Sequence, residues 1–300
     1  MKVYSEFKTS YFLKYSGAFS FSNQSAEYPI GGTFIMNLFT PAEVAENIRN
    51  IGETKGKLPF RKLILLGIAA GAFISFGAFA AISISAGWPD PWASSGLNKA
   101  AMAAVFTVGL ILVVLTGAEL FTGNNMFLAV SVLEKKSTVT ELLRNWSIVF
   151  LANFAGALII IGLIAGGHFL SDGSTVTAMG EKALAIGEAK VSLSFSAAFF
   201  RAIACNWLVC LAVWLASAAK DVVGKIFGCF FPIMAFVLSG FEHSVANMFF
   251  IPAAMTVPGN TITLAEFLLG NLLPVTLGNI IGGGVFVGML FWGAYLRPKK

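Results

Sequence analysis

The chain has 300 residues, of which 57% are hydrophobic and 12% are charged. Soluble domains carry about 25% charged residues, so this composition excludes a soluble globular protein and predicts an all-α integral membrane protein. The formal net charge of +5 does not indicate a nucleic-acid partner, because the lysines and arginines are scattered between apolar segments and form no single basic face.

Residues 1–36 contain no apolar run with a small-residue cleavage site and do not resemble a signal peptide. We expect this segment to be a disordered or appended leader. Thr40, Pro41 and Glu43 then form a capping-box pattern with proline at the first helical position. Three apolar residues fall on one face of the helix that follows, namely Val44, Ile48 and Ile51. This helix is either an amphipathic helix on the membrane surface or a plain connector.

Six later segments are long enough to cross a bilayer, which takes about 20 apolar residues per helix. They cover approximately residues 62–87, 100–133, 145–170, 194–218, 225–256 and 271–296. The second and the fifth are too long for one simple crossing, and each is interrupted by small and polar residues, at 116–125 (TGAELFTGNN) and 239–248 (SGFEHSVANM). We therefore expect six transmembrane helices, of which the second and the fifth are broken.

Most lysines and arginines lie before the first span and after the second, fourth and sixth spans. By the positive-inside rule, this pattern predicts a multi-pass protein of the cell membrane with both termini in the cytoplasm. The opposite side carries Lys99, Lys182 and Lys190, with Arg201 just inside the fourth span, against the acidic residues Asp90, Asp172, Glu181, Glu188 and Glu266.

The sequence gives little support for an enzyme. Glu242 and His243 are adjacent in an apolar region, but no H-E-x-x-H motif is present and the other histidine, His168, lies at the end of the third span. The cysteines lie within apolar segments without C-x-x-C spacing, at Cys205, Cys210 and Cys229. We predict packed core thiols and neither a disulfide framework, a metal site nor a cofactor.

The two interrupted segments are similar to each other. GAELFTGN at 117–124 and GFEHSVAN at 240–247 share Gly, Glu and Asn at the same offsets, and the helices that follow, from residues 145 and 271, share the pattern N-x7-N-x2-G. We interpret residues 37–300 as a channel domain made of two three-helix repeats, about 62–170 and about 194–296. Because each repeat crosses the membrane an odd number of times, the repeats have inverted topology and bring the two breaks together near the midplane.

The breaks indicate a permeation path, because non-helical backbone at that depth is tolerated only inside protein or along a watery cavity. Glu119, Glu242 and His243 lie at the breaks, and ionisable residues within a membrane indicate function. The matched positions of the two glutamates favour a structural role, in which they satisfy backbone donors across the pseudo-two-fold interface. The repeat mate of His243 is Leu120, so symmetry does not require a histidine, and we expect it to be functional.

Four segments resemble signatures of the formate/nitrite transporter family. They are GAELFTG (117–123), AIACNWLVCLA (202–212), SGFEHSVANMFFIP (239–252) and NLLPVTLGNIIGGG (271–284), within a resemblance that runs from Asn37 to about Arg297. The resemblance implies an aquaporin-like protomer and a homopentamer with one pore per protomer and lipid at its centre. Small residues such as those at 282–284 permit the close helix packing that this fold needs.

The resemblance also implies roles for individual residues. His243 corresponds to the central pore histidine, Thr122 to the threonine that faces it, Asn206 to a pore asparagine and Lys190 to the lysine of the outer vestibule. Two apolar constrictions are implied, an outer one formed by Phe106 and Phe236, and an inner one formed by Leu110, Leu120, Phe121 and Val209.

These observations predict a channel or transporter for small monovalent weak-acid anions, with formate as the first candidate and nitrite or hydrosulfide as alternatives. A bare anion loses several kcal/mol of hydration in a dry constriction, whereas protonating a carboxylate of pKa about 4 at pH 7 costs ~4 kcal/mol. We therefore predict that Lys190 concentrates the anion, and that His243, oriented by Glu242 or Asn206, lends it a proton or a positive charge.

Two further classes remain open at this point. A neutral-solute channel of the aquaporin type would have the same architecture, although paired N-P-A motifs are absent. A proton-coupled symporter is not distinguished from a channel by sequence.

Overall fold

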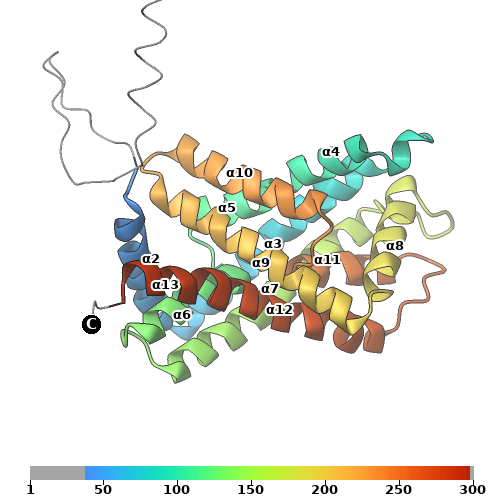
Figure 1. Ribbon diagram of the computed structural model, residues 1–300. Helices are drawn as coiled ribbons and strands as arrows, with labels where there is room; N and C mark the ends of the chain where they lie inside the picture. Colours follow the sequence, from blue (N-terminus) through green and yellow to red (C-terminus); the bar gives the residue numbers. More distant parts are fainter. Residues whose placement is uncertain (1–37, 298–300) are drawn as a thin grey trace, which may run out of the picture. The chain divides into compact units, whose positions relative to one another are not determined.

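The computed structural model describes residues 38–297 of the protein (Figure 1). The leader expected at residues 1–36 lies outside the described residues. Within 38–297 the protein is all-helical, with two isolated β-bridges and no strand. The predicted all-α fold is confirmed.

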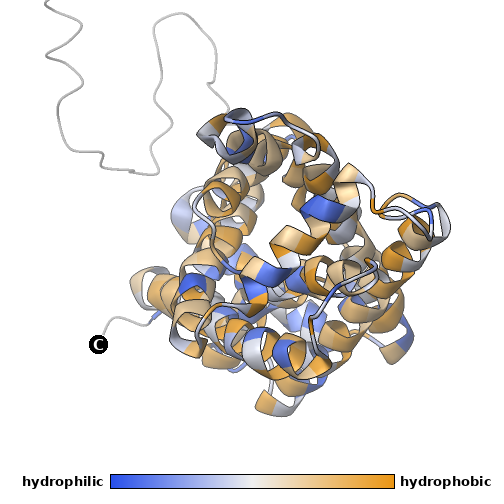
Figure 2. Cartoon of the chain, turned by 90° about the vertical axis from the view of Figure 1, so that its right-hand side faces the viewer, coloured by the Kyte–Doolittle hydropathy of each residue, from blue (hydrophilic) through white to orange (hydrophobic). Residues whose placement is uncertain are grey.

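The helical elements follow one another with short connections. They are α2 (Pro41–Gly56), α3 (Phe60–Ser85), η1 (Trp92–Ser94), α4 (Gly96–Phe106), α5 (Val108–Thr116), α6 (Phe121–Leu133), α7 (Val139–Gly166), α8 (Ala178–Val191), α9 (Phe195–Ala218), α10 (Val222–Leu238), α11 (Ser244–Met255), η2 (Glu266–Leu272), α12 (Leu273–Gly283), η3 (Gly284–Met289) and α13 (Leu290–Tyr295). Among the described residues, five helical segments are long and apolar enough to cross a bilayer, and three shorter apolar helices are α6, α10 and α11. In Figure 2 most of the helical ribbon has the hydrophobic colour, and several hydrophilic segments lie among the central helices.

Two non-helical breaks interrupt the apolar segments where the sequence pattern placed them. α5 ends at Thr116 and α6 begins at Phe121, while α10 ends at Leu238 and α11 begins at Ser244. A glycine with positive φ is the first residue of the first break and the second residue of the other, Gly117 at 72° and Gly240 at 69°. Glycine adopts this left-handed conformation without the steric penalty of a Cβ, so the chain leaves the helix at these positions.

The start of α2 has the predicted cap. The hydroxyl of Thr40 accepts a hydrogen bond from the backbone N–H of Glu43, and the carboxylate of Glu43 accepts one from the backbone N–H of Thr40. Pro41 occupies the first helical position. These reciprocal bonds satisfy backbone donors that a helix start otherwise leaves without partners.

The apolar face of α2 packs against protein. Val44 and Ile48 are buried, whereas Ile51 is 37% exposed. α2 contacts α6, and Gly52 lies so close to the carbonyl of Phe127 that a Cβ would not fit between them. Most of the predicted apolar face therefore packs on the protein, which corrects the expectation that this face lies on the membrane surface.

Small residues allow the long helices to approach closely. α3 packs against α7, and α9 packs against α12. A Cβ added to Gly156 of α7 would overlap the carbonyl of Ile68, and one added to Gly282 of α12 would overlap the carbonyl of Ile203. The expected close packing at 282–284 is therefore present. The cysteines of α9 and α10 are free and buried.

Candidate functional site

Two cavities approach the breaks from the two ends of the helical bundle. The α8-side cavity has a volume of about 130 Å³, and its lining includes Phe106, Lys190, Phe236 and His243. The α2-side cavity has a volume of about 520 Å³, and its lining includes Lys55, Leu110, Leu120 and Asn124. The two cavities share no lining residue. Seven of the sequence-predicted site residues line one of these two cavities: Phe106, Lys190, Phe236, Glu242 and His243 on the α8 side, and Leu110 and Leu120 on the α2 side. The other five, Glu119, Phe121, Thr122, Asn206 and Val209, line neither cavity.

His243 and Thr122 join the two breaks. His243 is the N-cap of α11, and its Nδ1 accepts a hydrogen bond from the backbone N–H of Ala246 at 3.0 Å. Its Nε2 lies 2.9 Å from Oγ1 of Thr122, in the first turn of α6. Because Nδ1 is the acceptor, a neutral imidazole carries its hydrogen on Nε2 and donates it to Thr122. The structure therefore brings together the two residues that the resemblance placed face to face.

The imidazole is oriented by partners other than those predicted. Its hydrogen bonds go to Ala246 and Thr122, so the prediction that Glu242 or Asn206 orients His243 is wrong. Asn206 instead donates to the backbone carbonyl of Thr122 at 3.1 Å. Asn206 also donates to the carbonyl of Asn279 at 2.6 Å, and Asn279 accepts a hydrogen bond from the N–H of Ser244, the residue after His243. Asn206 thus binds neighbours of the imidazole and makes no hydrogen bond to the ring itself.

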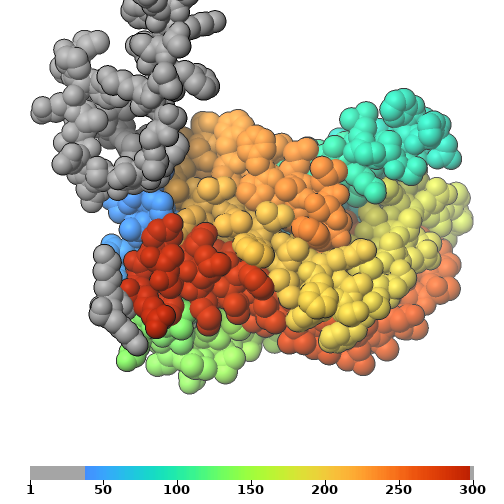
Figure 3. All heavy atoms as spheres, in the orientation of Figure 1, coloured from blue at the N-terminus to red at the C-terminus, as the bar shows by residue number. Residues whose placement is uncertain are grey.

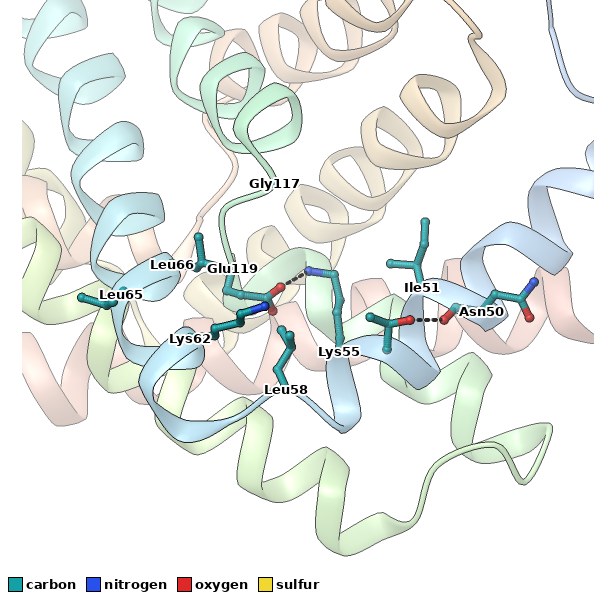
Figure 4. Close-up of a pocket in the computed structure, with 10 residues that line it drawn as sticks. Asn50, Ile51, Lys55, Leu58, Lys62, Leu65, Leu66, Gly117 and Glu119 are labelled. Carbon is teal, nitrogen blue, oxygen red and sulfur yellow. Dashed lines mark hydrogen bonds and ion pairs between the residues drawn. The ribbon is translucent and has the colours of Figure 1, made fainter.

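Each half of the protein has a buried lysine–glutamate pair beside its break. Nζ of Lys55 lies 2.6 Å from Glu119, and Nζ of Lys190 lies 3.0 Å from Glu242. Figure 4 shows the first pair, with Glu119 in the break that begins at Gly117. Both lysine side chains are 14% exposed, and an isolated charge would be costly there. The predicted partners of the glutamates were backbone donors; their carboxylates accept from lysine and asparagine side chains instead.

The two halves repeat one hydrogen-bond network. Its members are Lys55, Glu119, Asn124 and Asn145 in the first half, and Lys190, Glu242, Asn247 and Asn271 in the second. In each half the asparagine after the break donates to the glutamate and to the next asparagine. That next asparagine donates to the backbone carbonyl of the lysine. α2 and α8 thus have equivalent contacts, and we propose that the repeats begin with them, earlier than residues 62 and 194.

Lys55 is a site residue that the sequence reasoning missed. The same number of residues separates Lys55 from Gly67 and Lys190 from Ala202. The carbonyls of Gly67 and Ala202 accept equivalent hydrogen bonds from the asparagines of α7 and α12. Extending the internal repeat toward the N-terminus would have identified Lys55 as the counterpart of Lys190.

The predicted outer constriction lies directly beside the imidazole. The rings of Phe106 and Phe236 meet edge to face with centroids 5.6 Å apart. The ring of Phe236 also stacks against His243, with centroids 5.9 Å apart. Both rings line the α8-side cavity together with His243, so the surface next to the imidazole is apolar.

The residues predicted for the inner constriction have different locations. Leu110 and Leu120 line the α2-side cavity, and Val209 is buried on α9. The ring of Phe121 packs edge-on against Trp146 and Phe150 of α7, and neither cavity has Phe121 in its lining. Val209 also lines neither cavity, so the inner constriction stays a prediction for Phe121 and Val209.

Comparisons with known proteins agree with this geometry. A family model described as formate/nitrite transporter matches residues 42–293. A probable formate transporter of Methanothermobacter thermautotrophicus is 43% identical over 269 residues, which are 86% of this chain and 97% of the relative. The formate channel BtFdhC of Bacillus thuringiensis is 40% identical over 265 residues, 88% of this chain and 99% of that protein. A solved structure described as a pentameric formate channel with formate bound matches with a TM-score of 0.69 and 37% identity, covering 79% of this chain and 98% of that chain.

The matches cover the breaks, the buried pairs and the helices on both sides of them. They confirm the resemblance seen in the four sequence segments. They also confirm that the protein is not an enzyme, since the family consists of channels and transporters. The chain belongs to the formate/nitrite transporter family and is a multi-pass membrane protein for anion transport.

Proposed function

We propose that the protein is a channel for small monovalent weak-acid anions and that formate is its main substrate. The observation that carries this proposal is the hydrogen bond between His243 and Thr122, which joins the two breaks beside the aromatic rings of Phe106 and Phe236. The relatives described as formate transporters and channels favour formate over nitrite or hydrosulfide.

The hydrogen bonds of His243 limit how it can act on the anion. In the neutral imidazole, Nε2–H donates to Oγ1 of Thr122, and no other partner of that hydroxyl is found among the described residues. The hydroxyl hydrogen of Thr122 is then available to an oxygen of the anion. Neutral His243 supplies a hydrogen bond in this state; it does not supply a proton, because loss of Nε2–H would leave an imidazolate.

Proton-linked passage therefore starts from the imidazolium. Protonation of Nδ1 breaks its hydrogen bond with the N–H of Ala246, since both groups then donate. The Nε2 proton moves to Oγ1 of Thr122 as the hydroxyl proton moves to the carboxylate. The products are the undissociated acid and a neutral imidazole with its hydrogen on Nδ1. Loss of that hydrogen and uptake of a proton at Nε2 restore the neutral imidazole with its hydrogen on Nε2, from which the imidazolium forms again by protonation of Nδ1.

Energetics favour passage as the neutral acid. Protonating formate at pH 7 costs about 4 kcal/mol, which is no more than the several kcal/mol that a bare anion loses in an apolar constriction. Lys190 adds an attractive charge at the α8 side, although its pairing with Glu242 reduces that charge at a distance. At the α2 side, Glu119 pairs with Lys55 and reduces its charge in the same way.

We also propose that the protein forms a homopentamer with one pore in each protomer, because a similar solved structure is described as pentameric. The distribution of lysine and arginine supports a cytoplasmic location for the α2-side opening and for both termini. The lipid bilayer and small anions are then the partners of each protomer.

His243→Asn in proteoliposomes tests this function. The amide oxygen of asparagine can still cap α11, but the side chain does not titrate. We expect formate flux to rise as the pH falls in the unsubstituted protein, and to be lower and independent of pH in the variant. His168→Asn is the matched control, since His168 is exposed at the end of α7 and asparagine accepts its positive φ of 58°.

Two results would contradict the proposal. An unchanged pH profile in His243→Asn would exclude the proton relay. Flux of nitrite, hydrosulfide, water or glycerol without flux of formate would exclude formate as the substrate. Parallel measurements with these solutes therefore separate the anion channel from the neutral-solute alternative.

A further inference from the structure

A second, larger cavity opens from the α8-side cavity. We call it the α8-side mouth; its volume is about 720 Å³, and it shares Lys190 and Glu242 with the smaller cavity. Four cationic side chains line it, namely Lys99, Lys182, Lys190 and Arg201, and Glu242 is the one acidic residue in its lining. The helices that carry Lys99 and Lys182, α4 and α8, lie at the same end of the protein (Figures 1 and 3). The mouth therefore has an excess of positive charge.

Most of this charge lacks a counter-charge. Glu242 pairs with Lys190, while no ion pair of Lys99, Lys182 or Arg201 is found within residues 38–297. The pKa of Lys182 lies below its usual value, first because burial removes water from the ammonium group and second because Lys99 adds a like charge. Like charges that repel one another around a cavity are stabilised when an anion enters it.

The symmetry of the repeats does not account for these cations. Arg201 and Leu66 are equivalent, since their carbonyls accept hydrogen bonds from the N–H groups of Glu242 and Glu119. Lys182 and Asn47 are separated by the same number of residues as Lys190 and Lys55, so they are equivalent positions in the two repeats. Neither equivalent residue is charged. The groove beside Lys55, which has a similar volume of about 720 Å³, has Lys55, Lys62 and Glu119 as its charged lining residues (Figure 4). Its excess of positive charge is therefore smaller than that of the mouth.

We propose that the α8-side mouth is a binding site for small divalent oxyanions, formed by Lys99, Lys182 and Arg201. Coulomb attraction to the three cations grows with the charge of the ligand, so a divalent anion binds more tightly than a monovalent one. A divalent oxyanion does not pass the rings of Phe106 and Phe236, because it loses more hydration and needs two protons to become neutral. It therefore occupies the mouth and competes there with the permeant anion.

Isothermal titration calorimetry, with sodium sulfate added to the detergent-purified protein at low ionic strength, tests this site. We expect saturable binding that weakens at physiological salt, since the Debye length falls from about 30 Å at 0.01 M to about 8 Å at 0.15 M. The triple variant Lys99→Gln, Lys182→Gln and Arg201→Gln should bind sulfate at least about tenfold more weakly. The control triple variant Arg61→Gln, Lys135→Gln and Lys136→Gln removes the same number of exposed cations outside the mouth and should retain the affinity.

Binding is measured directly, so the outcome does not depend on whether formate is the substrate. Absence of saturable sulfate binding by the unsubstituted protein would overturn the proposal, as would equal affinities in the two triple variants. If the triple variant does not fold, Arg201→Gln alone is measured against Arg61→Gln. Both arginines are exposed, and we expect a loss of affinity of about threefold for the first and no loss for the second.

Discussion

Asn153 and Asn279 make the same three hydrogen bonds in the two halves of the protein. Each amide oxygen accepts the N–H of the first residue of the helix after a break, Phe121 at 2.9 Å and Ser244 at 2.8 Å. Each amide nitrogen donates to two backbone carbonyls, one in the break and one in the long helix that precedes it. The asparagines thus provide hydrogen-bond partners for backbone groups in the breaks, which lipid tails could not provide.

Replacing either asparagine by alanine should destabilise the protein. Asn153→Ala or Asn279→Ala leaves three buried backbone groups without their partner, and each such group costs about 1–3 kcal/mol. We expect a clearly lower melting temperature of the detergent-purified protein for both variants, with similar shifts because the contacts are equivalent. Asn50→Ala, at an exposed position of α2, is the control. If Asn279→Ala melted at the same temperature as Asn50→Ala, the hydrogen bonds of Asn279 would not stabilise the break.

The pattern N-x7-N-x2-G was visible in the sequence, and it correctly indicated an internal repeat. Its chemical meaning was not visible, because every partner is distant in sequence. In the structure the first asparagine holds the carbonyl of a buried lysine, the second supports the break, and the glycine allows close helix packing.

The sequence indicated His243 because an ionisable residue in an apolar segment is exceptional, and the resemblance supplied Thr122. That the imidazole caps α11 by accepting the N–H of Ala246 could not be predicted, since any residue three positions into a helix offers the same N–H. Residue type alone does not show which way the ring of Phe121 points; in the structure it packs against Trp146.

Two glycines of α7 should respond differently to alanine. A Cβ at Gly156 overlaps the carbonyl of Ile68 on α3, whereas Gly162 has open space around it. We expect Gly156→Ala to separate α7 from α3 and lower the melting temperature, by a cost of about 1–3 kcal/mol typical of overpacking. Gly162→Ala should leave it unchanged or slightly higher. Equal melting temperatures of the two variants would contradict the close packing of α7 against α3 at Gly156.

The buried pair of Lys190 and Glu242 should show strong coupling. Lys190→Met leaves a buried carboxylate without its partner, which costs about 3–5 kcal/mol when such a pair is broken. The double variant Lys190→Met, Glu242→Gln removes both charges, and glutamine can still accept a hydrogen bond from Asn247. We therefore expect the double variant to melt at a higher temperature than Lys190→Met. A double-mutant cycle measures this coupling, and simple additivity of the two substitutions would refute it.

The start of α2 should weaken in acid because of Glu43. The pKa of this carboxyl lies below its usual value, first because of the hydrogen bond from the backbone N–H of Thr40 and then because of the bond with the Thr40 hydroxyl. A lowered pKa in the folded state stabilises the fold above the unfolded pKa of about 4.3, and the effect is lost as the pH falls through the folded pKa. Hydrogen exchange of the first turn of α2, corrected for the intrinsic pH dependence, should therefore accelerate in acid. Glu43→Gln retains a capping box without a titratable group, so its protection should not change over the same pH range; an equal acid-induced loss in that variant would assign the weakening to another group.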